Sequence, residues 1–285
     1  MRDIRLFVCC HRKENVPEHP LLHPIQVGAA LSDERFAGFL QDDAGENISR
    51  QNRSYCELTA QYWAWKNARA DYCGFFHYRR YLYPDTAAKR PYIIRPKPTE
   101  VLLDRLGYAG FAELIGQYDL IVPSGEDMRV SVREHYASAP HHRAKDLALI
   151  EEIVAERSPG MKAAMEAYLS GTVHHFGNMY IMRREVFADY CAWLFPILEE
   201  FDARADTTGY SAQELRVDGY LAERLLGVYY THRKHELRTL ELPRVHFLTG
   251  RDYVKKRLLY ALLPPGTRRR ALVKQVKLRR HRKGP

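Results

Sequence analysis

IRLFVCC, at residues Ile4–Cys10, decides the fold, because it is apolar, rich in β-branched and aromatic side chains, and flanked by charges. Such a run predicts a buried strand. The stretch YCGFFH at Tyr72–His77 has the same character and predicts a second buried strand. Between them, aromatic and aliphatic residues recur at three- and four-residue spacing, which predicts an amphipathic helix over residues 53–70.

Strand-like and helical segments alternate along the rest of the chain. Further strands are expected at residues 119–123, 174–183 and 245–248, and further helices at residues 101–116, 143–157, 161–169, 184–204 and 212–229. This alternation predicts an α/β fold, with a sheet covered by helices on both faces. No repeat or low-complexity linker precedes residue 253, so we expect one domain over residues 1–250 and a basic tail over residues 251–285.

The net charge of +9 is concentrated in that tail. Thirteen Lys and Arg residues against one acid give residues 251–285 a charge of +12, which leaves −3 for residues 1–250. An enzyme acting on nucleic acid would spread basic charge over its body, so we expect no nucleic-acid partner.

Five cysteines without a CxxC pair indicate a reduced, cytoplasmic chain. No signal peptide or run of about 18 apolar residues is visible in the sequence, so the expected location is cytoplasmic and peripheral to the inner membrane.

Polar side chains follow the two strongest strands at their carboxyl ends. His11, Arg12 and Lys13 follow the first strand, and the second ends in His77, Tyr78, Arg79 and Arg80. Ligands of open α/β sheets bind beyond these strand ends, and arginine holds phosphate oxygens through two parallel donors. A nucleotide diphosphate is therefore the expected ligand, with a solvated basic edge as the alternative.

Several motifs that bind nucleotides or metals are missing from the sequence. There is no GxxxxGK[ST], GxGxxG, HExxH or metal-binding DxD motif, and Glu200-Phe201-Asp202 has the DxD spacing but falls at the end of a predicted helix. We therefore expect no metal and no cofactor. Arg79, Arg80 and His77 would supply the positive charge that a metal otherwise gives to a diphosphate.

Long, unusual stretches of the sequence resemble a known family. They are HPIQVGAAL (23–31), DDAGENIS (42–49), NRSYCELTAQYWAWKN (52–67), GFFHYRRYL (74–82), HHFGNMYIM (174–182) and GYLAERL (219–225). The chain resembles the polysaccharide-biosynthesis family catalogued as domain of unknown function 4422, whose members sit in capsule, exopolysaccharide and O-antigen gene clusters. The family is similar to GT-A glycosyltransferases, and related domains of O-antigen polymerases transfer galactofuranose from UDP.

The resemblance implies a GT-A-like mixed sheet and an inverting, metal-independent transferase. The expected donor is a UDP-sugar that carries galactofuranose or galactose, and the expected acceptor is a lipid-linked saccharide. His11, Asp42 and Asp43 would lie near the uridine and ribose. The alternative is that the two aspartates only shape a turn. His77, Tyr78, Arg79 and Arg80 fall where GT-A enzymes carry the DxD motif, so they would face the diphosphate.

An inverting transfer also needs a base for the acceptor hydroxyl. GT-A enzymes take it from a late carboxylate near a helix start, which points to Glu223 or Asp218, with Glu57 as the rival. Arg224 would reach a phosphate, unless Glu223 and Arg224 only form an ion pair on a helix surface.

His174, His175 and Asn178 are expected to hydrogen-bond the acceptor. The His pair has no acidic or cysteine partner at metal-ligand spacing, which argues against a metal site.

The tail begins with an amphipathic segment at residues 253–263, followed by a run of Arg and Lys. Such a segment suits an anionic membrane surface, at about 1 kcal/mol per basic residue. A disordered, solubilising tail is the alternative. Besides a glycosyltransferase, the sequence is compatible with two other functions. One is a non-catalytic subunit that binds nucleotide-sugar or polysaccharide, and the other is a nucleic-acid-associated protein recruited by the tail.

Overall fold

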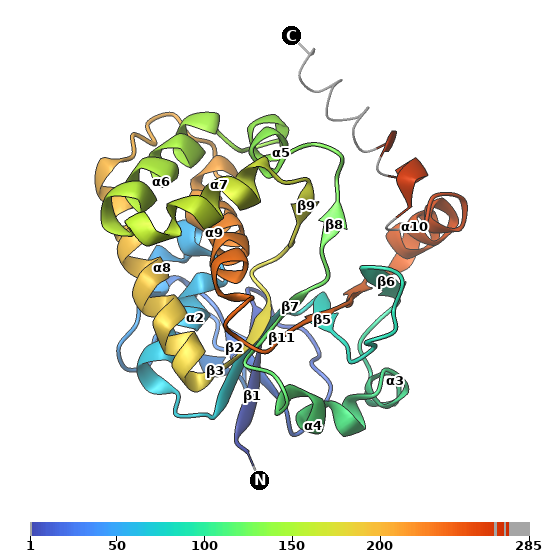
Figure 1. Ribbon diagram of the computed structural model, residues 1–285. Helices are drawn as coiled ribbons and strands as arrows, with labels where there is room; N and C mark the ends of the chain where they lie inside the picture. Colours follow the sequence, from blue (N-terminus) through green and yellow to red (C-terminus); the bar gives the residue numbers. More distant parts are fainter. Residues whose placement is uncertain (1, 265–266, 271, 274–285) are drawn as a thin grey trace.

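The computed structural model describes residues 2–264, 267–270 and 272–273 (Figure 1). Its strands are β1 (Ile4–Cys10), β2 (Leu22–Gln26), β3 (Leu40–Gln41), β4 (Tyr72–His77), β5 (Arg80–Leu82), β6 (Tyr92–Arg95), β7 (Leu120–Pro123), β8 (Glu126–Asp127), β9 (Val173–His174), β10 (Tyr180–Arg183), β11 (Thr239–Leu242) and β12 (Arg244–Phe247). Its helices are α1 (Asn52–Tyr55), α2 (Leu58–Asn67), α3 (Glu100–Arg105), α4 (Phe111–Ile115), α5 (Val132–Ser138), α6 (Ala144–Arg157), α7 (Lys162–Ser170), α8 (Arg184–Arg204), α9 (Val217–Arg233) and α10 (Gly250–Leu262).

One mixed sheet of ten strands organises the chain. Its main path runs β11-β7-β10-β4-β1-β2-β3, and β5, β12 and β6 extend it beside β4. β1 pairs in parallel with both β2 and β4, whereas β10 is antiparallel to β4 and β7. The carboxyl ends of β1 and β4 therefore lie together in the middle of the sheet, as the sequence predicted.

Side chains of β1 alternate between two apolar cores, because successive residues of a strand point to opposite faces. Phe7 and Cys9 join the larger core, which packs beneath α2, α6, α7, α8 and α9. Ile4, Leu6 and Val8 join the smaller core beside α3 and α4. Figure 1 shows these two groups of helices on opposite sides of the sheet. The expected α/β class with helices on both faces is confirmed.

Two predicted elements are interrupted by glycines in the left-handed region. The helix expected over residues 101–116 divides into α3 and α4 near Gly107, which has a φ of 84°. The strand expected over residues 174–183 divides into β9 and β10, and Gly177, also at φ 84°, turns the chain between them. The helix expected from residue 212 begins later, at Val217, after the short 3-10 turn Glu214–Arg216.

The first part of the basic tail forms α10, which starts at Gly250 and lies beside β6 (Figure 1). The rings of Tyr260 and Tyr92 meet with centroids 5.6 Å apart. Most of the Arg- and Lys-rich run that follows, residues 274–285, lies outside the described residues.

Candidate functional site

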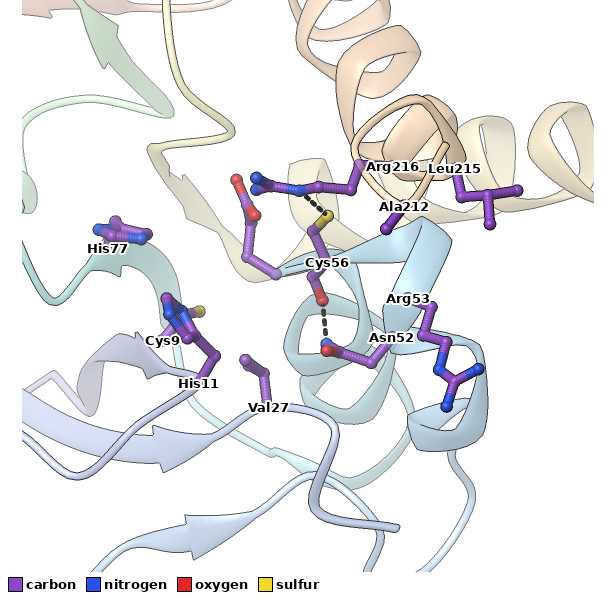
Figure 2. A pocket seen from close by; sticks show the side chains of 11 residues that line it. Cys9, His11, Val27, Asn52, Arg53, Cys56, His77, Ala212, Leu215 and Arg216 are labelled. Carbon is purple, nitrogen blue, oxygen red and sulfur yellow. Dashed lines mark hydrogen bonds between the residues drawn. The ribbon is translucent and has the colours of Figure 1, made fainter. Parts of the chain in front are cut away.

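A cavity of about 480 Å³ lies at the carboxyl ends of β1 and β4, and we refer to it as the strand-end pocket. Its lining residues are Cys9, His11, Val27, Asn52, Arg53, Cys56, Glu57, His77, Ala212, Leu215 and Arg216. Figure 2 shows His11 and His77 on one side and Cys56 and Arg216 on the other. The ring centroids of His11 and His77 are 6.3 Å apart, so the two polar strand ends meet at one site.

The helix predicted over residues 53–70 is broken, and the break forms one wall of this pocket. α1 ends at Tyr55, and Cys56 has φ 52° and ψ −127°, a conformation that non-glycine residues rarely adopt. Asn52 holds the turn, because its side-chain amide donates to the Cys56 carbonyl at 2.6 Å and its own carbonyl accepts from the Cys56 N–H at 2.9 Å. Backbone strain of this kind concentrates at functional sites. The break brings Cys56 and Glu57 to the pocket wall.

The start of α9 packs directly against this break. Gly219 allows the approach, since a β-carbon at that position would lie 3.2 Å from Cys56 Sγ. Burial raises the pKa of Cys56 to about 11, so the thiol is neutral near pH 7. Arg216 Nε donates to this sulfur at 3.3 Å (Figure 2), which fixes the guanidinium beside the pocket.

Glu57 is the carboxylate of the strand-end pocket. Burial raises its pKa above the ordinary value, and the nearby Arg216 partly opposes the shift. Asn178 Nδ2 donates to Glu57 Oε1 at 3.3 Å and to the Gly219 carbonyl at 2.9 Å. Asn178 therefore orients Glu57. A carboxylate with a raised pKa, held in place in a cavity, suits proton transfer near neutral pH.

His77 does not carry the positive charge expected of it. Burial, reinforced by Arg80 and Arg79, lowers its pKa to about 2, so the ring is neutral. Its Nδ1 accepts from the Arg79 backbone N–H at 3.2 Å, which leaves the proton on Nε2 as a donor. Burial also lowers the pKa of His11. The positive charge of this pocket comes from Arg216 and Arg53 instead.

Arg79 and Arg80 open onto different cavities. Arg79 and Tyr78 line a depression of about 440 Å³, where the Tyr78 ring has Arg12 and Arg79 at 5.2 and 5.0 Å from its centroid. Arg80 lines another cavity of about 620 Å³, which we call the basic cavity, together with Arg244, Lys256 and Arg270. Arg79 and Arg80 thus line separate cavities, and their binding of one diphosphate stays a prediction.

Glu223 lines the basic cavity rather than the strand-end pocket. Its Oε2 accepts from the Gly177 backbone N–H at 2.5 Å, and its Oε1 pairs with Arg224 at 2.7 Å. Arg224 is itself buried, lies over the Tyr136 ring and lines none of these three cavities. The ion pair between Glu223 and Arg224, one of the two alternatives expected from the sequence, is thus present, and a phosphate contact of Arg224 stays a prediction.

Asp218 has no exposed surface and lines none of the three cavities. It accepts from the Ser54 hydroxyl, and burial next to Asp202 raises its pKa to about 8. In this structure it ties α9 to α1, away from the three cavities, and its role as the base stays a prediction.

Asp42 is also fully buried, and its carboxylate is occupied within the protein. It accepts from the backbone N–H groups of Gly28 and Ala29 at 2.7 and 2.9 Å, and from the hydroxyls of Ser49 and Thr59. Asp43 pairs with Arg35 at 2.7 Å. Of the two readings, the structure favours the one in which Asp42 shapes the loop.

The residues expected to hold the acceptor have separate environments. His174 is buried, with its ring stacked on Phe176. His175 Nε2 lies 3.2 Å from Glu241 Oε1. Neither histidine lines the three cavities, and only Asn178 connects to the strand-end pocket, through Glu57.

Sequence reasoning missed Arg53, Cys56 and Arg216 as pocket residues. Arg216 is about 140 residues from His77 and carries no motif, because it reaches the site only through the packing of α9 against α1. The uninterrupted helical pattern of residues 53–70 concealed the break that exposes Cys56 and Glu57.

Metal-binding clusters and membrane-spanning helices are both absent from the described residues. Among them, no group of three or more His, Cys, Asp or Glu side chains is arranged to hold a metal ion. Within the same ranges, no helix combines the length and apolar character that a membrane span requires.

Comparisons with known proteins agree with this architecture. The family model described as Domain of unknown function (DUF4422) matches residues 5–234. No curated protein matches the chain. A solved structure of the bifunctional glycosyltransferase WbbM, in its apo form, is similar at 29% identity with a TM-score of 0.81. The similarity covers 86% of this chain and 45% of that one, so this chain spans less than half the length of WbbM. The expected glycosyltransferase-like fold is confirmed.

Proposed function

The chain belongs to the DUF4422 family, and from this premise we propose that it is a glycosyltransferase of polysaccharide synthesis that uses a nucleotide-sugar donor. The observation that carries the proposal is the strand-end pocket, where Glu57 and Arg216 face the same space at the carboxyl ends of β1 and β4. Its volume of about 480 Å³ falls within the usual size of small-molecule sites. The likeness to a bifunctional glycosyltransferase supports the reaction class.

We assign the donor to the strand-end pocket, with UDP as its nucleotide. Arg216 and Arg53 supply positive charge for the two phosphates, and the Nε2–H of neutral His77 supplies a hydrogen-bond donor. Fixed donors of this kind stabilise the negative charge that develops on a leaving diphosphate. The donor sugar that we propose is galactofuranose or galactose, on the family resemblance alone.

Glu57 is the base in this scheme. It removes the proton of the acceptor hydroxyl while that oxygen attacks the anomeric carbon, and the bond from that carbon to the diphosphate oxygen breaks. The sugar is transferred with inversion, and UDP leaves as the anion. Glu223 is the second carboxylate near the site, but Gly177 and Arg224 already occupy its oxygens.

We propose that the acceptor is a lipid-linked saccharide, met at the inner surface of a membrane. Val254, Leu258 and Leu262 support this, because they recur at four-residue spacing on α10 and are 56%, 64% and 77% exposed. Basic residues accompany them, as in helices that lie in an anionic membrane surface.

A screen of UDP-sugars tests the function. The full chain is incubated with each UDP-sugar and a saccharide acceptor, with and without EDTA, and released UDP is measured. Release that persists in EDTA is the expected result. UDP binding without turnover for every donor and acceptor would favour the non-catalytic subunit instead.

A further inference from the structure

The basic cavity contains three cations that have no ionic partner among the described residues. The side chains of Arg80, Lys256 and Arg270 form no hydrogen bond or ion pair with any residue that the structure describes. Burial, with Arg80 and Arg270 nearby, lowers the pKa of Lys256. Like charges gathered in one cavity repel each other, so an anion bound among them would be stabilised.

The carboxylates of this cavity are already neutralised by other arginines. Glu126 pairs with the buried Arg244, and Glu223 pairs with Arg224. Arg244 also donates to the Phe176 carbonyl at 3.1 Å. Among the described residues, no carboxylate therefore forms an ion pair with Arg80, Lys256 or Arg270, although Glu223 and Asp252 are near enough to act on Arg80 and Lys256 through their charge.

The cavity is also close to the proposed reaction site. Glu223 lines it, and the charges of Glu57 and Glu223 both act on Arg80. Tyr92 and Tyr260 also line it, and the Arg270 guanidinium lies over the Tyr260 ring at 4.5 Å from its centroid. A ligand in this cavity would lie next to a donor in the strand-end pocket.

We infer that the basic cavity binds a phosphate or diphosphate group of the acceptor, through Arg80, Lys256 and Arg270. The identification of the ligand as an acceptor rests on the proposed function, but the anion site itself does not depend on it. Two arginines supply two-pronged donors to phosphate oxygens, and a lysine supplies a point charge.

The two faces of α10 fit this assignment. Lys256 and Tyr260 are one turn apart and line the cavity, whereas Leu258 and Leu262 are exposed. α10 is therefore a wall of the acceptor site as well as a candidate membrane contact. A lipid-linked acceptor carries its phosphates next to the lipid, which is where this wall would meet them.

The test is calorimetric titration of inorganic pyrophosphate into the full chain saturated with UDP. Pyrophosphate should still bind, and Lys256→Ala or Arg80→Ala should weaken that binding about tenfold or more, with UDP affinity unchanged. Lys255→Ala, on the same helix but outside the cavity lining, is the matched control and should bind as the wild type does. No binding to the UDP-saturated protein, or an equal loss in Lys255→Ala, would overturn the inference.

A kinetic arm distinguishes a phosphate of the acceptor from a free phosphate or a lipid headgroup. Without vesicles, Lys256→Ala should raise KM about tenfold for a diphosphate-linked saccharide and leave KM unchanged for the same saccharide without the diphosphate. An equal change for both would refute recognition of the acceptor phosphate. If the protein binds pyrophosphate through Lys256 but does not bind UDP, the proposed function fails while the anion site stands.

Discussion

The guanidinium of Arg216 donates to the thiol of Cys56 at 3.3 Å and so joins the start of α9 to the break between α1 and α2. Two segments that are 160 residues apart thereby form one wall of the strand-end pocket. The cation is held in place before any ligand arrives, which reduces the entropy lost on binding.

Arg216→Ala should weaken UDP binding about 10- to 100-fold, because a hydrogen bond to a charged group contributes about 1.5–3 kcal/mol. Calorimetric titration of UDP measures the change. Arg105→Ala removes the same charge from α3, outside the pocket lining, and should leave the affinity unchanged. Equal affinities in all three proteins would remove Arg216 from the donor site.

Glu57→Gln should lower kcat about 10²- to 10⁴-fold while UDP binding stays near the wild-type level. A base must be ionised, and burial raises the pKa of Glu57. The wild-type kcat should therefore fall as the pH drops through a value above the ordinary range of glutamate. Turnover is measured as UDP release across pH 4–9. A normal kcat in Glu57→Gln, together with a loss in Glu223→Gln, would transfer the role to Glu223.

Asp218→Asn should flatten the pH dependence of stability. The pKa of Asp218 is about 8 in the fold against 3.8 ordinarily, so between these values the folded state holds a proton that the unfolded state has lost. The free energy of unfolding of the wild type should therefore fall as the pH rises from about 4 to 8. Thermal melts between pH 5 and 8 measure this slope. Asp127→Asn, at an exposed carboxylate, should keep it, and an unchanged slope in Asp218→Asn would contradict the burial argument.

Gly227→Ala should destabilise the fold by about 1–3 kcal/mol, since crowding a packed contact has this cost. A β-carbon at Gly227 would lie 2.0 Å from the Tyr168 ring, where α7 packs on α9. Urea unfolding measures the difference. Gly160→Ala is the matched control, because its β-carbon would meet nothing within 4 Å. Equal midpoints for both variants would show that the ring moves aside freely.

Leu258→Glu should reduce flotation with anionic liposomes, because it places a charge in the exposed apolar stripe of α10. Val101→Glu makes the same change at an exposed valine on α3 and should float like the wild type. Equal flotation of the wild type with neutral and anionic liposomes would discredit electrostatic docking.

Much of the fold could be predicted from local patterns. β1, β4 and α8 have the predicted bounds, because each is a long apolar or amphipathic run whose periodicity is set by its own residues. The proximity of His11 and His77 could also be predicted, because the carboxyl ends of the parallel strands β1 and β4 lie at the same edge of the sheet.

The finer site could not be predicted, because distant contacts decide it. The break at Cys56 depends on α9 passing at Gly219, and the role of Asp42 depends on the loop folded around it. The neutral state of His77 depends on burial and on neighbouring arginines, neither of which a single sequence reveals.

The imidazole of His77 keeps one ionisation state throughout the physiological range, since its pKa is about 2. A mildly acidic pH would therefore leave its contribution to the pocket unchanged, and it cannot act as a sensor of acidity. A response of the strand-end pocket to mild acid is expected instead from Glu57, whose pKa is raised by burial.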